Sequence, residues 1–198
     1  MNRHLGNEIR SLRYSLSMTL EELAQRSGLS IGYLSQIERD LKRPSSSALE
    51  RISEAFGTSV EWFLHIPPVD DPVEAMHVVR RDARRRMQFS RTAEERRRQD
   101  RNFLLSPTLE HDIVMALIVL PPGEGGDVAP ATHPGQEVGF VQAGRLTLEI
   151  GGQRMVLDEG DSWFLKGSSP HRYINEGTEV VRLIVANTPA ALLIRTTA

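Results

Sequence analysis

The sequence has 198 residues, 39% hydrophobic and 25% charged, which is the composition of an ordinary globular protein and not of a collagen-like or disordered chain. It contains no cysteine, which excludes disulfide frameworks, thiolate zinc sites and thiol nucleophiles, so a metal would have to use His, Asp or Glu. The longest apolar stretch, residues 113–122, is far shorter than the ~20 residues of a membrane-spanning helix. The start of the chain has no apolar signal core, so we expect a cytoplasmic protein with no membrane partner.

The charges are distributed unevenly along the chain. Acidic and basic residues balance over residues 1–64, basic residues exceed acidic ones by three over 65–105, and acidic residues exceed basic ones by five over 106–198. The near-neutral total therefore conceals a basic middle segment and an acidic C-terminal half, which favour different partners.

Helical spacing of apolar residues runs through the N-terminal third. Apolar residues recur at intervals of three and four, and Thr19 with Glu22 (a capping box), Gly28 and Ser30 stand where helix ends are expected. The pattern predicts five helices, at about 5–16, 19–26, 30–38, 47–56 and 59–64.

The periodicity stops after residue 64. Residues 66–101 contain Pro67-Pro68 and ten arginines from Arg80 to Arg101, which predicts a linker that ends in edge strands. From residue 102 onward short β-branched or alternating runs are separated by Gly, Pro, Asp and Asn, which is typical of a small all-β barrel or sandwich. The predicted strands include 113–120, 137–141, 145–150, 162–166 and 180–186.

Residues 22–39 predict a helix, a tight turn and a second helix. Ala24 is small where the helices cross, Gly28 allows a left-handed turn, and Leu34 with Ile37 anchors the second helix. This stretch resembles the Xre/Cro-type helix-turn-helix family, whose five-helix domain would cover residues 5–64. The alternative is a helical bundle without a DNA role.

The resemblance implies that the second helix enters the major groove of double-stranded operator DNA. Its base-reading positions would be Ile31, Gly32, Tyr33, Ser35 and Gln36, among which Gln36 suits adenine. Phosphate contacts would come from Ser30, Arg39, Lys42, Arg43, Ser46 and Ser47. Arg13 and Glu38 match a structural ion pair of the family.

Two segments of the C-terminal half carry a second pattern. Residues 125–144 and 160–175 resemble the two cupin motifs, which implies a double-stranded β-helix with an internal pocket. His133, Glu137 and His171 match three of the four metal-ligand positions, whereas Ala131 replaces the first His, and Lys166 and Ser168 replace the Pro and Gly of the second motif. The expected fold class is α+β in separate domains: an all-α helix-turn-helix domain at 1–65, a linker with Arg-rich edge strands at 66–101, and an all-β cupin sensor domain at 102–198.

Three interpretations of His133, Glu137 and His171 remain open: a pocket for an organic ligand without metal, a metal-assisted effector site, and packing residues. The first is favoured because a ligand position is missing, and because an ammonium ligand would give the buried Glu137 carboxylate a partner. Aromatic rings, Trp163 or Phe164 and Tyr173, could flank such a cation. The predicted effector-binding residues are His133, Glu137, Phe140, Trp163, His171 and Tyr173. No catalytic residue and no cofactor are predicted; a divalent metal, if present, would use His133, Glu137 and His171.

The segments 133–141 and 184–189 and the pair Pro170-His171 are similar to the putrescine-utilisation repressor group of helix-turn-helix/cupin regulators. That resemblance implies a polyamine effector whose binding releases the operator. Relatives with the same two domains sense amino acids, peptides or other small amines, so the predicted effector is a polyamine or another amine or amino-acid metabolite.

The arginine clusters 84–86 and 96–98 have two interpretations: contacts to DNA phosphates, or solvated strand edges and loops, of which the second is favoured.

The sequence as a whole predicts a DNA-binding transcriptional regulator, a repressor that is not an enzyme, acting as a homodimer through its cupin barrels. The alternatives are a metal-dependent cupin enzyme, either a dioxygenase or an isomerase, with an accessory DNA-binding domain, and an antitoxin-like binding module.

Overall fold

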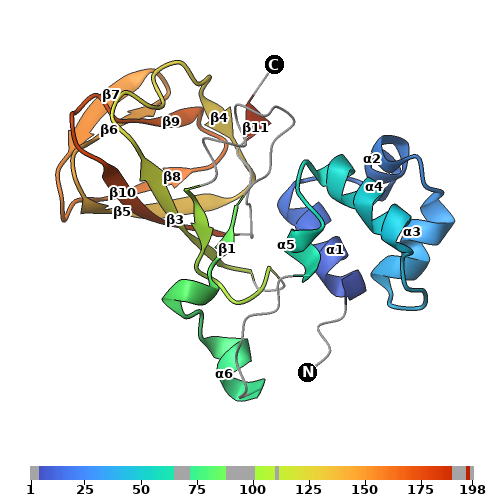
Figure 1. Cartoon of the computed structure of the whole chain (residues 1–198). Coiled ribbons are helices and arrows are strands. Elements are labelled where there is room, and N and C mark those ends of the chain that lie inside the picture. Colours follow the sequence, from blue (N-terminus) through green and yellow to red (C-terminus); the bar gives the residue numbers. More distant parts are fainter. Residues whose placement is uncertain (1–4, 65–71, 88–100, 110–111, 189–194, 197–198) are drawn as a thin grey trace.

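The computed structural model describes residues 5–64, 72–87, 101–109, 112–188 and 195–196. Figure 1 shows a group of helices lying beside a β-barrel, with the short strand β1 at the side of the barrel that faces the helices. Among the described residues, no helix combines the length and the apolar character needed to cross a membrane.

Five helices form the N-terminal head, which we define as residues 5–64. They are α1 (Leu5–Ser15), α2 (Leu20–Ser27), α3 (Ile31–Glu38), α4 (Ser46–Phe56) and α5 (Glu61–Leu64). The predicted ends are right to within about two residues because the stop signals are local. Thr19 and Glu22 form the reciprocal capping box, and Gly28 ends α2 in a left-handed conformation with φ of 64°.

The head is held together by one apolar core and one buried ion pair. Ile9, Leu12, Leu23 and Ile52, from three helices, have no exposed surface, and neither have Leu34 and Ile37 of α3. The Arg13 guanidinium donates to both oxygens of Glu38, from Nε at 2.7 Å and from Nη2 at 2.8 Å. The predicted Arg13–Glu38 ion pair is therefore confirmed.

The segment predicted as a linker that ends in edge strands also contains helical structure that was not predicted. Helix α6 (Pro72–His77) and the 3₁₀ turn η1 (Arg81–Ala83) precede strand β1 (Arg85–Arg86). Arg80, which follows α6, forms an ion pair with Glu74 of that helix, with 2.6 Å between Nε and Oε1. Six residues are too few to show a helical period, so α6 was not predicted, although Asp71-Pro72 is a sequence signal of a helix start.

The C-terminal region consists of two antiparallel sheets. The six-stranded sheet has the order β1–β2–β3–β10–β5–β8, and the five-stranded sheet has the order β11–β4–β9–β6–β7. The strands are β2 (Phe103–Leu104), β3 (Val114–Leu120), β4 (Ala131–Thr132), β5 (Gln136–Ala143), β6 (Leu146–Ile150), β7 (Gln153–Leu157), β8 (Ser162–Lys166), β9 (His171–Ile174), β10 (Val181–Thr188) and β11 (Arg195–Thr196). The predicted α+β fold class, with a region of five helices followed by all-β sheets, is confirmed.

Alternation along β5 decides which side chains reach the barrel interior. Glu137, Gly139 and Val141 are buried, whereas Gln136, Val138 and Phe140 are exposed. Because successive side chains of a strand point to opposite faces, the interior of the barrel receives every second residue of β5, beginning with Glu137.

The head packs directly against the first strands of the six-stranded sheet. One cluster of buried apolar side chains includes Trp62 of the head together with Leu104 of β2 and Ala116 of β3. Arg85 of β1 is also buried there and pairs with Glu8 of α1. Neither interpretation of the 84–86 cluster holds for Arg85, because this guanidinium is neither solvated nor available to phosphate. The second cluster, 96–98, lies outside the described residues.

Candidate functional site

Helix α3 has one buried face, which packs on the core of the head, and one exposed face. Leu34 and Ile37 fix the helix to the core, and Ser30 caps its start by accepting a hydrogen bond from the Tyr33 amide at 3.2 Å. Ile31, Gly32 and Gln36 are consequently exposed, while Tyr33 and Ser35 are half-buried. The residues predicted to read bases therefore have surface on the outer side of α3.

The predicted phosphate-binding residues surround the same helix in sequence and remain exposed. These residues are Ser30, Arg39, Lys42, Arg43, Ser46 and Ser47. Lys42 places its Nζ 5.1 Å from the centre of the Tyr33 ring, so the turn after α3 folds back over the helix. Ser46 and Ser47 begin α4, where backbone amides point outward and suit a phosphate oxygen.

Arg51 is a positioning residue that sequence reasoning missed. From α4 it donates to the carbonyl of Ser27 at 2.7 Å and to that of Gly28 at 2.6 Å. These bonds fix the turn between α2 and α3, and with it the entry angle of α3. No local signal could have revealed them, since the partners lie 24 and 23 residues apart.

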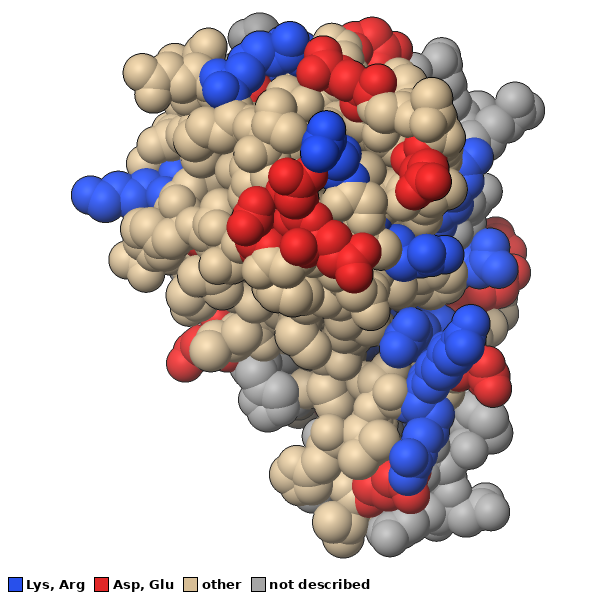
Figure 2. All heavy atoms as spheres, turned by 90° about the vertical axis from the view of Figure 1, so that its left-hand side faces the viewer, with Lys and Arg blue, Asp and Glu red and all other residues tan. Residues whose placement is uncertain are grey.

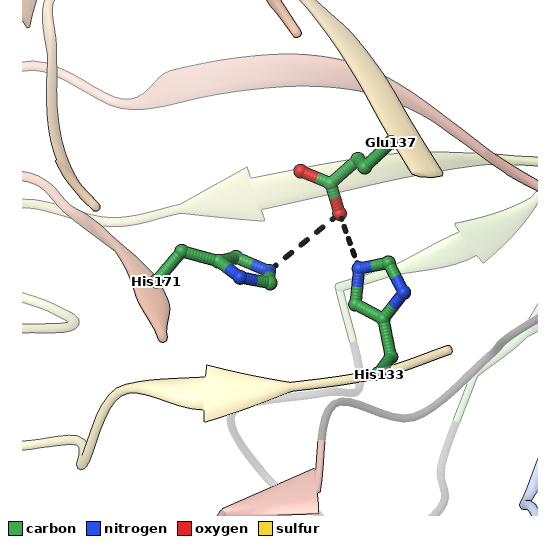
Figure 3. Close-up of side chains that lie close together, drawn as sticks. All are labelled: His133, Glu137 and His171. Atoms are coloured by element: carbon green, nitrogen blue, oxygen red, sulfur yellow. Dashed lines mark hydrogen bonds and ion pairs between the residues drawn. The ribbon is translucent and has the colours of Figure 1, made fainter. Parts of the chain in front are cut away.

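Inside the barrel, His133, Glu137 and His171 form a cluster that we call the acceptor cluster. Figure 3 shows both imidazole rings directed at one oxygen of the Glu137 carboxylate. His133 Nε2 is 3.3 Å and His171 Nε2 is 3.8 Å from Glu137 Oε2, and all three side chains are almost fully buried. The residues come from three places: the start of β5 (Glu137), the start of β9 (His171) and the segment joining β4 to β5 (His133).

The outer ring nitrogens of both histidines are tied to backbone carbonyls. His133 Nδ1 lies 2.9 Å from the Pro134 oxygen, and His171 Nδ1 lies 2.8 Å from the Ser169 oxygen. Only a protonated nitrogen can donate to a carbonyl, so in the neutral ring each Nε2 carries a lone pair. His171 Nε2 is buried and has no hydrogen-bond partner among the described residues. Two lone pairs and a carboxylate oxygen thus face one another, an arrangement that needs a proton or another cation between them.

The other carboxylate oxygen is held by two aromatic residues through their polar atoms. Trp163 Nε1 donates to Glu137 Oε1 at 3.0 Å, and the Tyr173 hydroxyl donates to the same oxygen. The rings of Trp163 and Tyr173 lie with their centres 5.5 Å apart. These bonds fix the orientation of the carboxylate and leave Oε2 to the histidines.

The pKa values follow from this arrangement. Burial alone lowers the pKa of His133, but the hydrogen bonds to Glu137 and Pro134 and the charge of Glu137 outweigh it, so the pKa is raised. Burial alone raises the pKa of Glu137, but hydrogen bonds from His133, Tyr173 and Trp163 and the charge of His171 outweigh it, so the pKa is lowered. Both shifts favour the charged forms.

Phe140, which the sequence analysis placed in the effector site, lies on the opposite face of β5. Its side chain is 44% exposed, and Phe164, opposite Val138 on β8, is 56% exposed. Phe140 is three residues from Glu137, an odd spacing, so a strand directs the two side chains to opposite faces. Neither phenylalanine can flank a cation in the acceptor cluster.

Comparison with known proteins assigns both halves of the chain. Residues 9–63 match the family described as Helix-turn-helix, and residues 116–187 match the family described as Cupin domain. The chain is a helix-turn-helix–cupin protein. It is 25% identical over 184 residues to the HTH-type transcriptional regulator PuuR of Escherichia coli, covering 93% of this chain and 94% of that protein. It is thus a distant relative of that regulator, as the sequence resemblance predicted.

Other proteins match one region of the chain, or align over most of it at low similarity. An uncharacterised HTH-type transcriptional regulator of Mycobacterium tuberculosis is 40% identical over 78 residues, covering 39% of this chain and 54% of that protein. Among solved structures, an HTH_3 family transcriptional regulator from Vibrio cholerae aligns with TM-score 0.41 and 19% identity, over 94% of this chain and 96% of that one. The hydroxypropylphosphonic acid epoxidase from S. wedmorenis aligns with TM-score 0.47 and 21% identity, over 93% of this chain and 96% of that one.

The cupin domain keeps a set of three residues that fits a divalent metal. The ligand atoms of His133, Glu137 and His171 all lie within 4.8 Å of one another. Two imidazole nitrogens and one carboxylate suit iron, manganese or zinc, and the Nδ1 contacts to carbonyls are those that orient metal-binding histidines. Ala131, which stands at the first His position of the motif, is buried and pairs with His171 in register, but its methyl group cannot bind a metal.

Proposed function

We propose that this helix-turn-helix–cupin protein is a transcriptional repressor whose acceptor cluster binds a small amine, most simply a polyamine, and that amine binding releases operator DNA. The observation that carries the proposal is the convergence of Glu137 Oε2, His133 Nε2 and His171 Nε2 on one buried point. A primary ammonium group has three N–H donors and no acceptor, so it can serve all three atoms. The excess of acidic residues over 106–198 favours the approach of a cation to the barrel.

The DNA-binding half of the proposal rests on the exposed face of α3. Gln36 is the side chain there that can make a bidentate pair with adenine, while Ile31 can contact a thymine methyl. So few contacts give modest specificity. We therefore propose a homodimer, assembled through the cupin barrels, whose two heads read half-sites about 34 Å apart in a palindromic operator.

A divalent metal in the acceptor cluster is the second candidate, and one observation favours it. Both histidines are oriented by carbonyls, which presents each Nε2 as a ligand atom. A bound metal would supply Lewis-acid chemistry to the barrel and would support either a metal-assisted effector site or a cupin enzyme. The chain's own contribution would then be to hold the metal through His133, Glu137 and His171, with Trp163 and Tyr173 fixing the carboxylate.

Thermal-shift titration of the metal-free chain distinguishes these ligands. Putrescine, spermidine, Mn²⁺ and Zn²⁺ are compared, since saturation at one hundred times the dissociation constant adds about 2.7 kcal/mol to stability. We expect the polyamines to stabilise the wild type and to have no effect on Glu137→Gln. Phe140→Ala, on the outer face, serves as the matched control and should respond as the wild type does. Stabilisation by the metals alone would replace the amine proposal with the metal one, and chemical conversion of the amine would replace it with an enzyme.

Operator binding is tested by fluorescence anisotropy on DNA from the chain's own promoter at fixed salt. Gln36→Ala should weaken operator binding by about 1–3 kcal/mol and keep the amine response, whereas Glu137→Gln should keep DNA binding and lose release by amine. Loss of both properties in both variants would contradict the division of labour between head and barrel.

A further inference from the structure

The head and the barrel are joined by a charged pair that is hidden from solvent. Arg85 of β1 donates to Glu8 of α1, and the two side chains are 5% and 6% exposed. The same guanidinium lies over the Trp62 ring of α5, with 4.4 Å from Cζ to the ring centre. A buried ion pair adds little net stability, but its geometric requirements are strict. The pair therefore defines one position of the head on the barrel.

Arg85 also ends a continuous row of residues across the six-stranded sheet. Adjacent strands pair Arg85 with Leu104, Leu104 with Ala116, Ala116 with Val185, Val185 with Gly139, and Gly139 with Trp163. Residues directly opposite on antiparallel strands share a face of the sheet. All six residues are buried: Leu104 and Ala116 pack in the cluster that includes the head, Val185 and Trp163 pack in the cluster of the barrel, and the pairing of β3 with β10 joins the two clusters.

The far end of this row touches the acceptor cluster. Trp163 Nε1 donates to Glu137 Oε1 at 3.0 Å. The indole lies directly on the backbone of Gly139, where an added Cβ would come within 2.0 Å of Trp163 Cζ2. The indole of Trp163 therefore lies between the carboxylate and β5, so that a displacement toward the strand presses on Gly139.

We propose that this row, from Trp163 to Arg85, couples the state of the acceptor cluster to the position of the head, with the Arg85–Glu8 pair as the contact that responds. The inference rests on the proposed role of the cluster as an effector site. A cation at Glu137 Oε2 draws the carboxylate toward His133 and His171, and so moves Oε1 and the Trp163 indole that donates to it. Close-packed interiors transmit such small shifts, and a strict ion-pair geometry converts them into a change between a docked and a released head.

Hydrogen exchange on the full chain tests the coupling without operator or effector. Gly139→Ala forces Trp163 to move. If that variant does not fold, Glu137→Gln takes its place, because it keeps the shape of the side chain and weakens the hydrogen bond to the indole. We expect exchange of the α1 and α5 amides to accelerate at least about fivefold, the lower end of usual coupling, relative to the slowest amides of α4. Gln136→Ala, an exposed change on the same strand, is the control and should leave α1 and α5 unchanged.

The role of the ion pair is tested in the double variant Glu8→Leu/Arg85→Met, which removes both charges and leaves neither buried alone. In that background Glu137→Gln should have no further effect on α1 and α5. Unchanged α1 and α5 amides in the first experiment, with altered exchange in β5 and β8, would overturn the coupling. A response that persists in the double variant would overturn the assignment to this pair.

A failure of the coupling can be distinguished from a failure of the function proposed above. If no amine binds but the exchange response is found, the effector identity is wrong and the coupling stands. If an amine releases DNA but α1 and α5 do not respond, the proposed function stands and the row does not carry the signal.

Discussion

Arg13 of α1 and Glu38, the last residue of α3, form a bidentate pair that joins the first helix of the head to the C-terminal end of α3. Arg13 also donates from Nη1 to the Met18 carbonyl at 3.0 Å, so three of its N–H groups are used at one point. The pair fixes the C-terminal end of α3 just as Arg51 fixes the turn before it.

Removing one partner of this pair should destabilise the head strongly. Arg13→Ala leaves Glu38 as a buried carboxylate without its partner, and we expect a loss of about 3–5 kcal/mol in the free energy of unfolding, measured by urea denaturation. Arg10→Ala on the exposed side of α1 is the matched control and should change stability by only about 0.5 kcal/mol. A loss at Arg13 no larger than that at Arg10 would show that the pair does not organise the head.

Substitutions at two exposed residues of the predicted DNA-binding surface, Gln36 and Lys42, should weaken DNA binding in different ways. Gln36→Ala should cost about 1–3 kcal/mol on the operator and little on unrelated DNA, because only base contacts carry sequence information. Lys42→Ala should weaken binding to all sequences and reduce the slope of log K against log salt by about 0.9. Anisotropy titrations at several salt concentrations measure both quantities, with Arg154→Ala on the barrel as the control. An unchanged salt slope in Lys42→Ala would remove Lys42 from the phosphate contacts.

The hydroxyl of Tyr173 should stabilise the barrel through Glu137. Tyr173→Phe deletes a hydrogen bond to a buried carboxylate and keeps the ring, so we expect a loss of about 1.5–3 kcal/mol in thermal or urea unfolding. The same substitution at Tyr14, whose side chain is 58% exposed, should cost less than about 0.5 kcal/mol. Equal effects at the two tyrosines would mean that the Glu137 carboxylate does not depend on Tyr173.

The acceptor cluster should make the stability of the metal-free chain depend on pH. The raised pKa of His133 stabilises the fold below its ordinary value of 6.5, and this contribution is lost as pH rises through the raised value. The lowered pKa of Glu137 stabilises the fold above its ordinary value of 4.5, and this contribution is lost as pH falls through the lowered value. The interaction is therefore fully present between about pH 4.5 and 6.5.

The variant His133→Gln isolates this effect. Its destabilisation relative to the wild type, from urea midpoints at pH 5.5 and pH 8.5, should be greater at pH 5.5. A larger difference at pH 8.5 would mean that His133 folds in its neutral form.

Much of the candidate site followed from sequence because its signals are local. The capping box, Gly28 and the anchors Leu34 and Ile37 lie within twenty residues, so they predicted α2, α3 and the exposed face of α3. The same period-two rule that directs Glu137 inward also directs Phe140 outward, so that residue could have been left out of the site from the sequence alone. The short helix α6 has the start signal Asp71-Pro72 but lacks the periodicity that identified the longer helices.

The sequence by itself determined the two kinds of domain and the residue types of the acceptor cluster, because helix caps, strand alternation and motif spacing act over a few residues. Only the tertiary structure decided that Trp163 and Tyr173 hold Glu137 by their polar atoms, and that one arginine of a basic run is buried against α1. Glu8 and Arg85 are 77 residues apart, and nothing local distinguishes Arg85 from its neighbours. Which charge of a run becomes buried depends on the packing of strand β1 against the helices, and that packing exists only in the folded chain.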